Sequence, residues 1–189
     1  MGEVLKFTAY HGTYKSYAVN ILRVGFYISN QNNDWLGKGV YFFEEDCNNA
    51  KKWAYRKWNK EKRPSEKYAV LKSEIEANSQ YVLDLTDQTQ CKYFAKMREE
   101  YQKRNARTFQ FNLKDVELDC LIMNKLCEKT RIDVAKKLDF IRFPKEVRLK
   151  IYSRIPNCVI ICVKNRDCCI KNTTIIDEGE FDVRSKEYL

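Results

Sequence analysis

The chain has 189 residues, of which 44% are hydrophobic and 13% aromatic, and it carries a formal net charge of +9. This length and composition predict one globular domain over residues 1–189, with a substantial core, and exclude a disordered tail. No apolar run approaches the roughly 20 residues that span a bilayer, and the first residues lack the pattern of a secretory signal. We therefore expect a cytoplasmic protein with no membrane partner.

Hydrophobic patterning predicts short strands that alternate with helices. In chain order we expect a strand at 4–10, a helix at 16–24, a loop at 29–34, a strand at 40–43, a helix at 46–58, strands at 67–76 and 81–85, helices at 87–104 and 115–129, and strands at 132–135, 159–163 and 174–176. Gly25 stops the first helix, Asp46 caps the second, and Pro64 breaks the pattern before the third strand. The mixture predicts the α+β class.

Eight cysteines raise the question of disulfides or a zinc site. Several of them fall in apolar periodic stretches, where cysteine behaves as a small hydrophobe, so we expect reduced thiols. Four of the cysteines cluster near the C-terminus: Cys158, Cys162, Cys168 and Cys169. They lack the paired spacing of zinc ligands, and the only histidine is remote from them. The sequence therefore predicts no metal site.

Lysine and arginine outnumber aspartate and glutamate by 35 to 26, and they concentrate in segments 51–63 and 96–107. Such a field attracts polyanions and accelerates encounters with nucleic acid. The same charges also suit an ordinary solvated surface, because charge alone sets no specificity. Nucleic acid is thus a candidate partner.

Two short segments carry the chemistry of the chain. The only histidine lies in Tyr10-His11-Gly12-Thr13, and glycines again precede an aromatic residue in Gly37-Lys38-Gly39-Val40-Tyr41. An imidazole can bond a hydroxyl, a glycine backbone can approach a carboxamide closely, and a tyrosine ring can stack on a heteroaromatic ring. Taken singly, each segment is also typical of a turn or of ordinary core.

Taken together, these two segments closely resemble the NAD-binding start of the ADP-ribosyltransferases of the diphtheria-toxin and poly(ADP-ribose) polymerase group. The resemblance covers mainly residues 4–54, where Gly25-Phe26 and Ala50 also match, and is weaker at 157–176. It implies a split, mostly antiparallel β-sheet with an NAD cleft and flanking helices. We expect a small single-domain member of the kind found in bacteria or phages.

The resemblance also implies roles for single residues. His11 contacts a ribose of NAD, Gly12 binds the carboxamide through its backbone, Thr13 completes the motif, and Tyr41 stacks on nicotinamide. A second aromatic residue is expected on the following helix, where Trp53 can fill the place although the spacing suits Lys52 better.

The position of the family's catalytic glutamate has no acidic residue in this chain. The preferred register puts Ile160 there, with Asn157 or Cys158 as alternatives. Two Glu-x-Glu pairs could supply an acid instead: Glu74 and Glu76, and Glu178 and Glu180. However, the arginine-modifying branch of these transferases, which uses this spacing, carries other motifs than the two found here. Asp119 or Asn124, on an amphipathic helix expected to pack on the sheet, could also face the cleft.

The implied activity is a mono-ADP-ribosyltransferase, which cleaves NAD, releases nicotinamide and transfers one ADP-ribose to nucleic acid or protein. A toxin or phage-defence role with an antitoxin or chaperone partner suits a small protein of this kind. The alternative is a binding module for NAD, ADP-ribose or nucleic acid that is weakly active or inert. An RNA 2′-phosphotransferase ranks behind both, because that group uses further histidines.

Overall fold

Strands and helices alternate along the computed structural model, which describes residues 2–61, 63, 65–105, 113–151, 153 and 155–182. The elements are β1 (Val4–Tyr14), α1 (Lys15–Val24), β2 (Val40–Glu44), α2 (Cys47–Glu61), β3 (Lys67–Asn78), η1 (Ser79–Tyr81), β4 (Val82–Asp84), α3 (Gln88–Asn105), α4 (Asp115–Lys129), β5 (Val134–Asp139), α5 (Pro144–Leu149), β6 (Cys158–Val163), α6 (Arg166–Cys169) and β7 (Ile170–Glu180).

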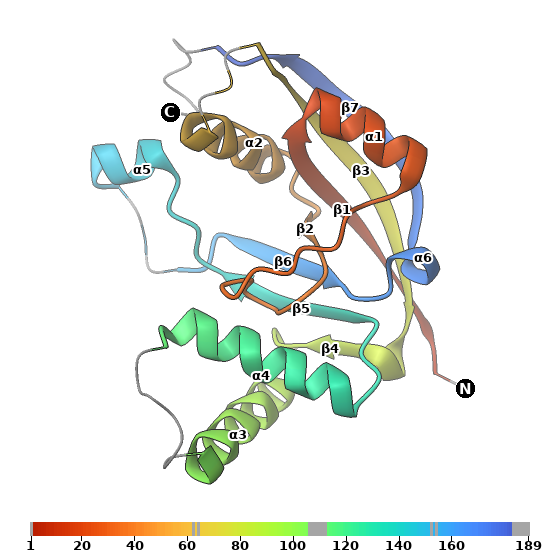
Figure 1. The fold of residues 1–189 in the computed structure, drawn as a ribbon, viewed down its shortest axis with the longest axis vertical. Helices are drawn as coiled ribbons and strands as arrows, with labels where there is room; N and C mark the ends of the chain where they lie inside the picture. Colours follow the sequence, from red (N-terminus) through yellow and green to blue (C-terminus); the bar gives the residue numbers. More distant parts are fainter. Residues whose placement is uncertain are drawn as a thin grey trace.

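Seven strands form one open sheet in the order β4-β5-β6-β2-β1-β3-β7. Every neighbouring pair is antiparallel except β4 and β5, which are parallel. The long strands β1, β3 and β7 run along one side of the molecule, and β6 and β5 run across them (Figure 1). The α+β class and the mostly antiparallel sheet with flanking helices are therefore confirmed.

The pairing between β1 and β2 extends over fewer residues than any other strand pairing in the sheet. Only Ala9 with Glu44 and Tyr10 with Phe43 are in register across it. In contrast, β1 pairs with β3 along residues 4–14. Beyond Tyr10, none of the described strands neighbours the β2-facing edge of β1, and this opens a gap in the sheet.

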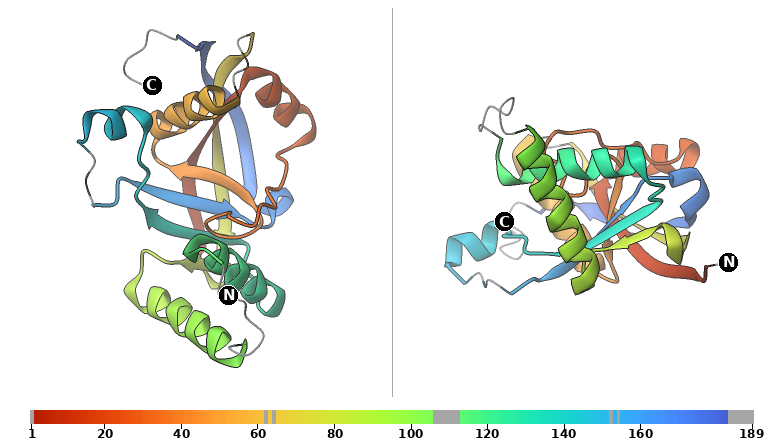
Figure 2. Two further views of the ribbon diagram at one scale, coloured as in Figure 1. Left: turned by 60° about the vertical axis from the view of Figure 1, so that its left-hand side comes forward. Right: turned by 90° about the horizontal axis from the view of Figure 1, so that it is seen from below.

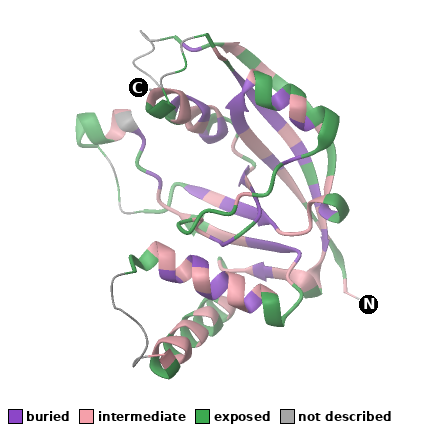
Figure 3. Ribbon diagram, in the orientation of Figure 1, coloured by how far each residue is buried: buried purple, intermediate pink, exposed green. Residues whose placement is uncertain are grey.

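Each face of the sheet carries its own hydrophobic core. Alternation along β1 sends Tyr10 and Tyr14 to the face covered by α2, and Ala9 to the face covered by α1. Helix α4 packs on the α2 face, where its Met123 joins the same buried cluster as Ile160. The buried positions follow the strands through the middle of the molecule (Figure 3). Helix α3 buries no residue, and the α3–α4 pair lies at the β4–β5 end (Figure 2).

Some expected boundaries were wrong because distant pairing decides them. The first strand continues to Tyr14 instead of ending at Tyr10, since residues 11–14 pair with 68–71 of β3. The last strand occupies Ile170–Glu180, not only 174–176, because it also pairs along β3. The strand expected at 132–135 is displaced to Val134–Asp139.

Two short helices, α5 and α6, had no prediction. The predicted cap of α2 is confirmed, because the Asp46 carboxylate accepts a hydrogen bond from the Asn49 backbone N–H at 2.8 Å. Pro64 lies outside the described residues. Within the described part of the chain, no helix is both long and apolar enough to cross a membrane.

Candidate functional site

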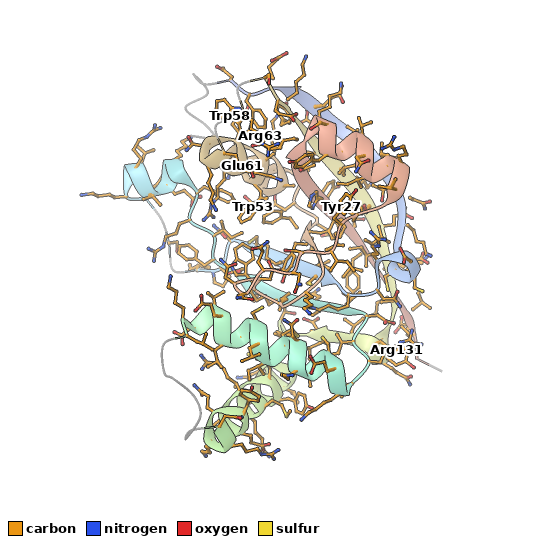
Figure 4. All side chains as sticks on the ribbon, viewed as in Figure 1. Tyr27, Trp53, Trp58, Glu61, Arg63 and Arg131 are labelled. Atoms are coloured by element: carbon orange, nitrogen blue, oxygen red, sulfur yellow. The ribbon has the colours of Figure 1, made fainter. Side chains whose placement is uncertain are left out.

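The gap between β1 and β2 opens into a pocket of about 530 Å³, which is within the usual range for small-molecule sites. Its floor is formed by residues 10–12 of β1, 39–43 at β2 and Ile160 of β6. One wall is α2, with Trp53, Arg56, Lys57, Lys60 and Glu61, and the other is the loop after α1, with Tyr27, Ser29 and residues 33–35. Figure 4 shows Trp53 and Tyr27 on the two sides of this opening.

The backbone of Gly12 points into the pocket. Along an antiparallel strand, the N–H and C=O of one residue face the same neighbour, and successive residues alternate. The Thr8 carbonyl accepts from the Glu45 N–H at 2.9 Å, so Thr8, Tyr10 and Gly12 all turn their peptide groups toward β2. Because the β1–β2 pairing ends at Tyr10, Gly12 offers a donor and an acceptor to the gap.

Gly12 is also a packing glycine. A Cβ built on it would lie 1.7 Å from the Ala50 carbonyl oxygen and 2.5 Å from the Ala50 carbonyl carbon. The backbone of α2 therefore rests directly on the β1 backbone. This contact holds α2, which is one wall of the pocket, against the Gly12 backbone, which is part of the floor.

His11 bridges the two separating strands. Its Nδ1 lies 2.8 Å from the Tyr41 carbonyl oxygen, which can only accept, so Nδ1 carries the proton and donates. The ring sits edge-on to Phe26 and Phe42, at centroid distances of 5.4 and 5.9 Å. Burial lowers the pKa of His11, which keeps the imidazole neutral. Nε2 is consequently an acceptor at the pocket floor, with no hydrogen-bond donor among the described residues.

The Tyr41 hydroxyl is fully engaged and does not reach for a ligand. It donates to the Gly37 carbonyl at 2.6 Å and accepts from the Leu36 N–H at 2.9 Å. Burial raises the pKa of this phenol far above its usual range, so it stays protonated. What Tyr41 presents to the pocket is a ring held in a fixed orientation.

Helix α2 places Trp53 rather than Lys52 in the pocket wall. The Trp53 ring lies 5.4 Å from that of Trp35, and the Arg56 guanidinium lies 5.0 Å above the Trp53 ring. Lys52 is outside the lining and sits 5.1 Å from the Phe143 ring. The helical period accounts for this choice, since positions 53, 56, 57 and 60 share one face.

The floor position expected for a catalytic glutamate is apolar. Ile160 lines the pocket, is 1% exposed and pairs with Phe43. The two alternatives, Asn157 and Cys158, are not part of the lining. Burial raises the pKa of the Cys158 thiol to about 12, so that group is neutral.

Thr13 lies apart from the other predicted site residues. Its side chain is buried on the α1 face and does not line the pocket. Five of the six predicted residues therefore line the pocket: His11, Gly12, Tyr41, Trp53 and Ile160. Thr13 belongs to the hydrophobic interior instead.

Asp34 is a pocket residue that the sequence pattern does not predict. Its carboxylate accepts from the Ser29 hydroxyl at 2.8 and 2.9 Å and from the Gln31 N–H at 2.7 Å. Glu61 is the other lining carboxylate and pairs with Arg63 at 3.1 Å. In the sequence, Asp34 ends an Asn- and Gln-rich stretch that is typical of a turn, so nothing local distinguishes it.

Neither Glu-x-Glu pair belongs to the pocket lining. Their carboxylates are engaged elsewhere, with partners on β1, α1, β3 or the start of β7: Glu76 with Lys6, Glu74 with Asn172, Glu178 with Lys15, and Glu180 with Lys67. They are structural contacts of the β3–β7 side of the sheet.

The loop that carries Asp34 is supported from α4. Asn124 accepts from the Lys38 N–H at 2.8 Å through Oδ1, and Lys164 donates to the Lys38 carbonyl at 2.7 Å. Asn124 thus positions the loop from behind. Asp119 faces α3 instead, where it pairs with Arg98 at 2.8 Å.

All eight cysteines are free thiols in the structure. Among the described residues, no group of three or more His, Cys, Asp or Glu side chains could hold a metal ion.

No family model matches the chain, and no solved structure is significantly similar to it. The chain is similar to an uncharacterized protein of Methanocaldococcus jannaschii, with 26% identity over 195 aligned positions. These cover 96% of this chain and 89% of the relative, so the similarity is not confined to the segment around His11. The relative's name states no activity, and function therefore rests on the pocket.

Proposed function

We propose that the protein is a mono-ADP-ribosyltransferase that uses NAD, built on an ADP-ribosyltransferase-like split sheet. One observation carries the proposal: the gap between β1 and β2 brings the free peptide edge of Gly12 beside the free Nε2 of His11. A carboxamide needs one acceptor and one donor at close range, and a ribose needs an acceptor for a hydroxyl. These groups occur together at the floor of one pocket.

In this proposal, the Gly12 N–H and C=O bind the nicotinamide carboxamide. The rings of Tyr41 and Trp53 border the nicotinamide, and His11 Nε2 accepts from a ribose hydroxyl. Lys57, the α2 cation near enough to His11 to contribute to lowering its pKa, supplies positive charge for the pyrophosphate of NAD. Burial of the leaving group positions the glycosidic bond and excludes water.

The bond between the ribose C1′ and the nicotinamide nitrogen breaks, and its electron pair leaves with nicotinamide. A lone pair of the acceptor then bonds to C1′, and the acceptor releases a proton. Ile160 offers no carboxylate to activate a second ADP-ribose unit, so the proposal is single-unit transfer. A toxin or phage-defence role stays a prediction.

Nicotinamide release from NAD tests the proposal directly. We expect the wild-type protein, given NAD and cell lysate, to release nicotinamide and to add one ADP-ribose unit to a macromolecule. Tyr41→Ala removes a pocket wall and should lower the rate by about 100-fold or more, by the sensitivity of bound geometry to displacement. Chromatography of nicotinamide and mass spectrometry of the lysate fractions give the two readouts. Absence of both products with wild-type protein would falsify the proposal.

Asp34 is the carboxylate we expect to assist the reaction, because it is the pocket acid held by neutral donors alone. Asp34→Asn should lower nicotinamide release by about 100- to 1,000-fold, the usual loss for one electrostatic or acid–base group. Ser29→Ala is the matched control, since it removes a loop hydrogen bond and keeps the carboxylate. Equal losses in the two variants would assign Asp34 a structural role only.

The apolar floor at Ile160 also favours a second candidate, a module that binds NAD or ADP-ribose without turnover. Calorimetry with NAD separates the two. Binding with no nicotinamide release, in lysate whose nucleic acid is intact, would establish the module.

A further inference from the structure

The mouth of the pocket carries three basic side chains, and two of them, Arg56 and Lys60, are exposed. Arg56, Lys57 and Lys60 lie on one face of α2 and line the pocket. None of the three forms an ion pair with a carboxylate of the described residues, but Lys57 interacts electrostatically with Glu61 and Glu66, so the exposed cations without an acidic partner are Arg56 and Lys60. Other cations nearby are neutralised, such as Lys51 by Asp177 and Arg63 by Glu61. The unpaired charge is therefore concentrated at the opening.

Aromatic rings lie beside these charges. The Arg56 guanidinium lies over the Trp53 ring, and its side chain is exposed to solvent. On the opposite side of the opening, Tyr27 lines the pocket and is 70% exposed, with its hydroxyl held by Asn20 at 3.0 Å. An exposed ring of this kind is a platform on which a planar base can stack.

We propose that the acceptor of the ADP-ribosyl group is a base of single-stranded nucleic acid, which reaches the pocket between Tyr27 and the Arg56–Lys60 face of α2. This inference rests on the proposed function for its chemistry. The charges fit phosphates, and the rings fit bases; an acidic peptide would use the charges and leave Tyr27 without a partner. A base inside a duplex could not reach a pocket floored by strands, whereas an unpaired base can.

The transfer needs no further reactant. A ring or exocyclic nitrogen of the base supplies the lone pair that bonds to C1′ as the bond to nicotinamide breaks. The nitrogen loses one proton to solvent, and nicotinamide leaves with the electron pair of the broken bond. NAD and the base give the modified base, nicotinamide and one proton.

The surface can be tested without NAD. We expect a fluorescein-labelled single-stranded 20-mer to bind the wild-type protein more tightly than the matched duplex does. In Arg56→Gln/Lys60→Gln, affinity at 0.1 M salt should fall roughly tenfold or more. The slope of log K against log salt should shrink by about 1.4, which is 2 × 0.7 for two lost phosphate contacts. Fluorescence anisotropy over a salt series measures both quantities.

Lys92→Gln/Lys96→Gln is the matched control, because it removes two exposed lysines at the same helical spacing on α3, away from the pocket. It should leave affinity and slope unchanged. Equal losses in the two double variants, or equal binding of duplex and single strand, would overturn the proposed surface.

Labelled NAD then identifies the acceptor. Label that is removed by nuclease and resists protease supports the proposal, and label removed by protease alone overturns it. Oligonucleotide binding without any nicotinamide release would refute the proposed enzyme while leaving the binding surface in place. The two failures are therefore distinguishable.

Discussion

Gly12→Ala is expected to damage both the packing of α2 and the proposed NAD site. The added methyl group would lie 1.7 Å from the Ala50 carbonyl oxygen, and this neighbour is backbone that cannot rotate away. Overpacking of this kind costs about 1–3 kcal/mol or more in the free energy of unfolding. Thermal unfolding should show a clear loss of Tm, and calorimetry at a temperature where the variant is folded should show loss of NAD binding.

Gly179→Ala is the control for this prediction. It makes the same chemical change in the same sheet, but its methyl group would meet side-chain atoms of Tyr68 at 3.1 Å, which can shift by a few tenths of an ångström. We expect a much smaller loss of stability and unchanged NAD binding. If Gly12→Ala behaves like Gly179→Ala, the backbone contact between β1 and α2 is not the constraint described above.

His11→Asn distinguishes the roles of the two ring nitrogen atoms of the histidine. The asparagine amide can still donate to the Tyr41 carbonyl in place of Nδ1, but nothing replaces Nε2. A ligand hydroxyl left without its acceptor costs about 1–3 kcal/mol, so nicotinamide release should fall by about 10- to 100-fold. Steady-state rates with NAD measure this loss. Full activity in His11→Asn would exclude Nε2 as a ligand contact.

The same residue gives the stability of the protein a dependence on pH. Burial lowers the His11 pKa in the folded chain, so on acidification the unfolded chain takes up its proton first. The stabilising contribution is present above the unfolded value near 6.5 and is lost as pH falls below it, until the folded ring is also protonated. The Tm difference between wild type and His11→Asn should therefore narrow between pH 7.5 and pH 5.

Local patterning was sufficient for much of this fold because most helices and strands have a clear period. It failed where distant pairing decides the outcome. Gly12 is typical of a turn when only its neighbours are considered, yet residues 68–71 extend the strand through it. The edge strand β7 alternates exposed and half-buried positions, so its ends carry too few apolar residues to be recognised.

The site was predictable to the extent that it rests on short motifs and helical periodicity. His11, Gly12 and Tyr41 belong to such motifs, and the position of Trp53 follows from the face that it shares with Lys57. Asp34 could not be found in this way. Its place in the pocket depends on a loop that Asn124 of α4 and Lys164, just after β6, hold from behind, and both come far later in the chain.

The backbone of Ala50 contacts the backbone of Gly12 directly, because Gly12 has no side chain to separate them. The seating of α2 on the floor of the pocket therefore does not depend on which residues occupy the outer face of that helix. Mutations at exposed rim positions such as Arg56 and Lys60 can accumulate without moving the floor. Descendants that keep Gly12 can therefore vary the side chains around the opening while the backbone beneath them keeps its position.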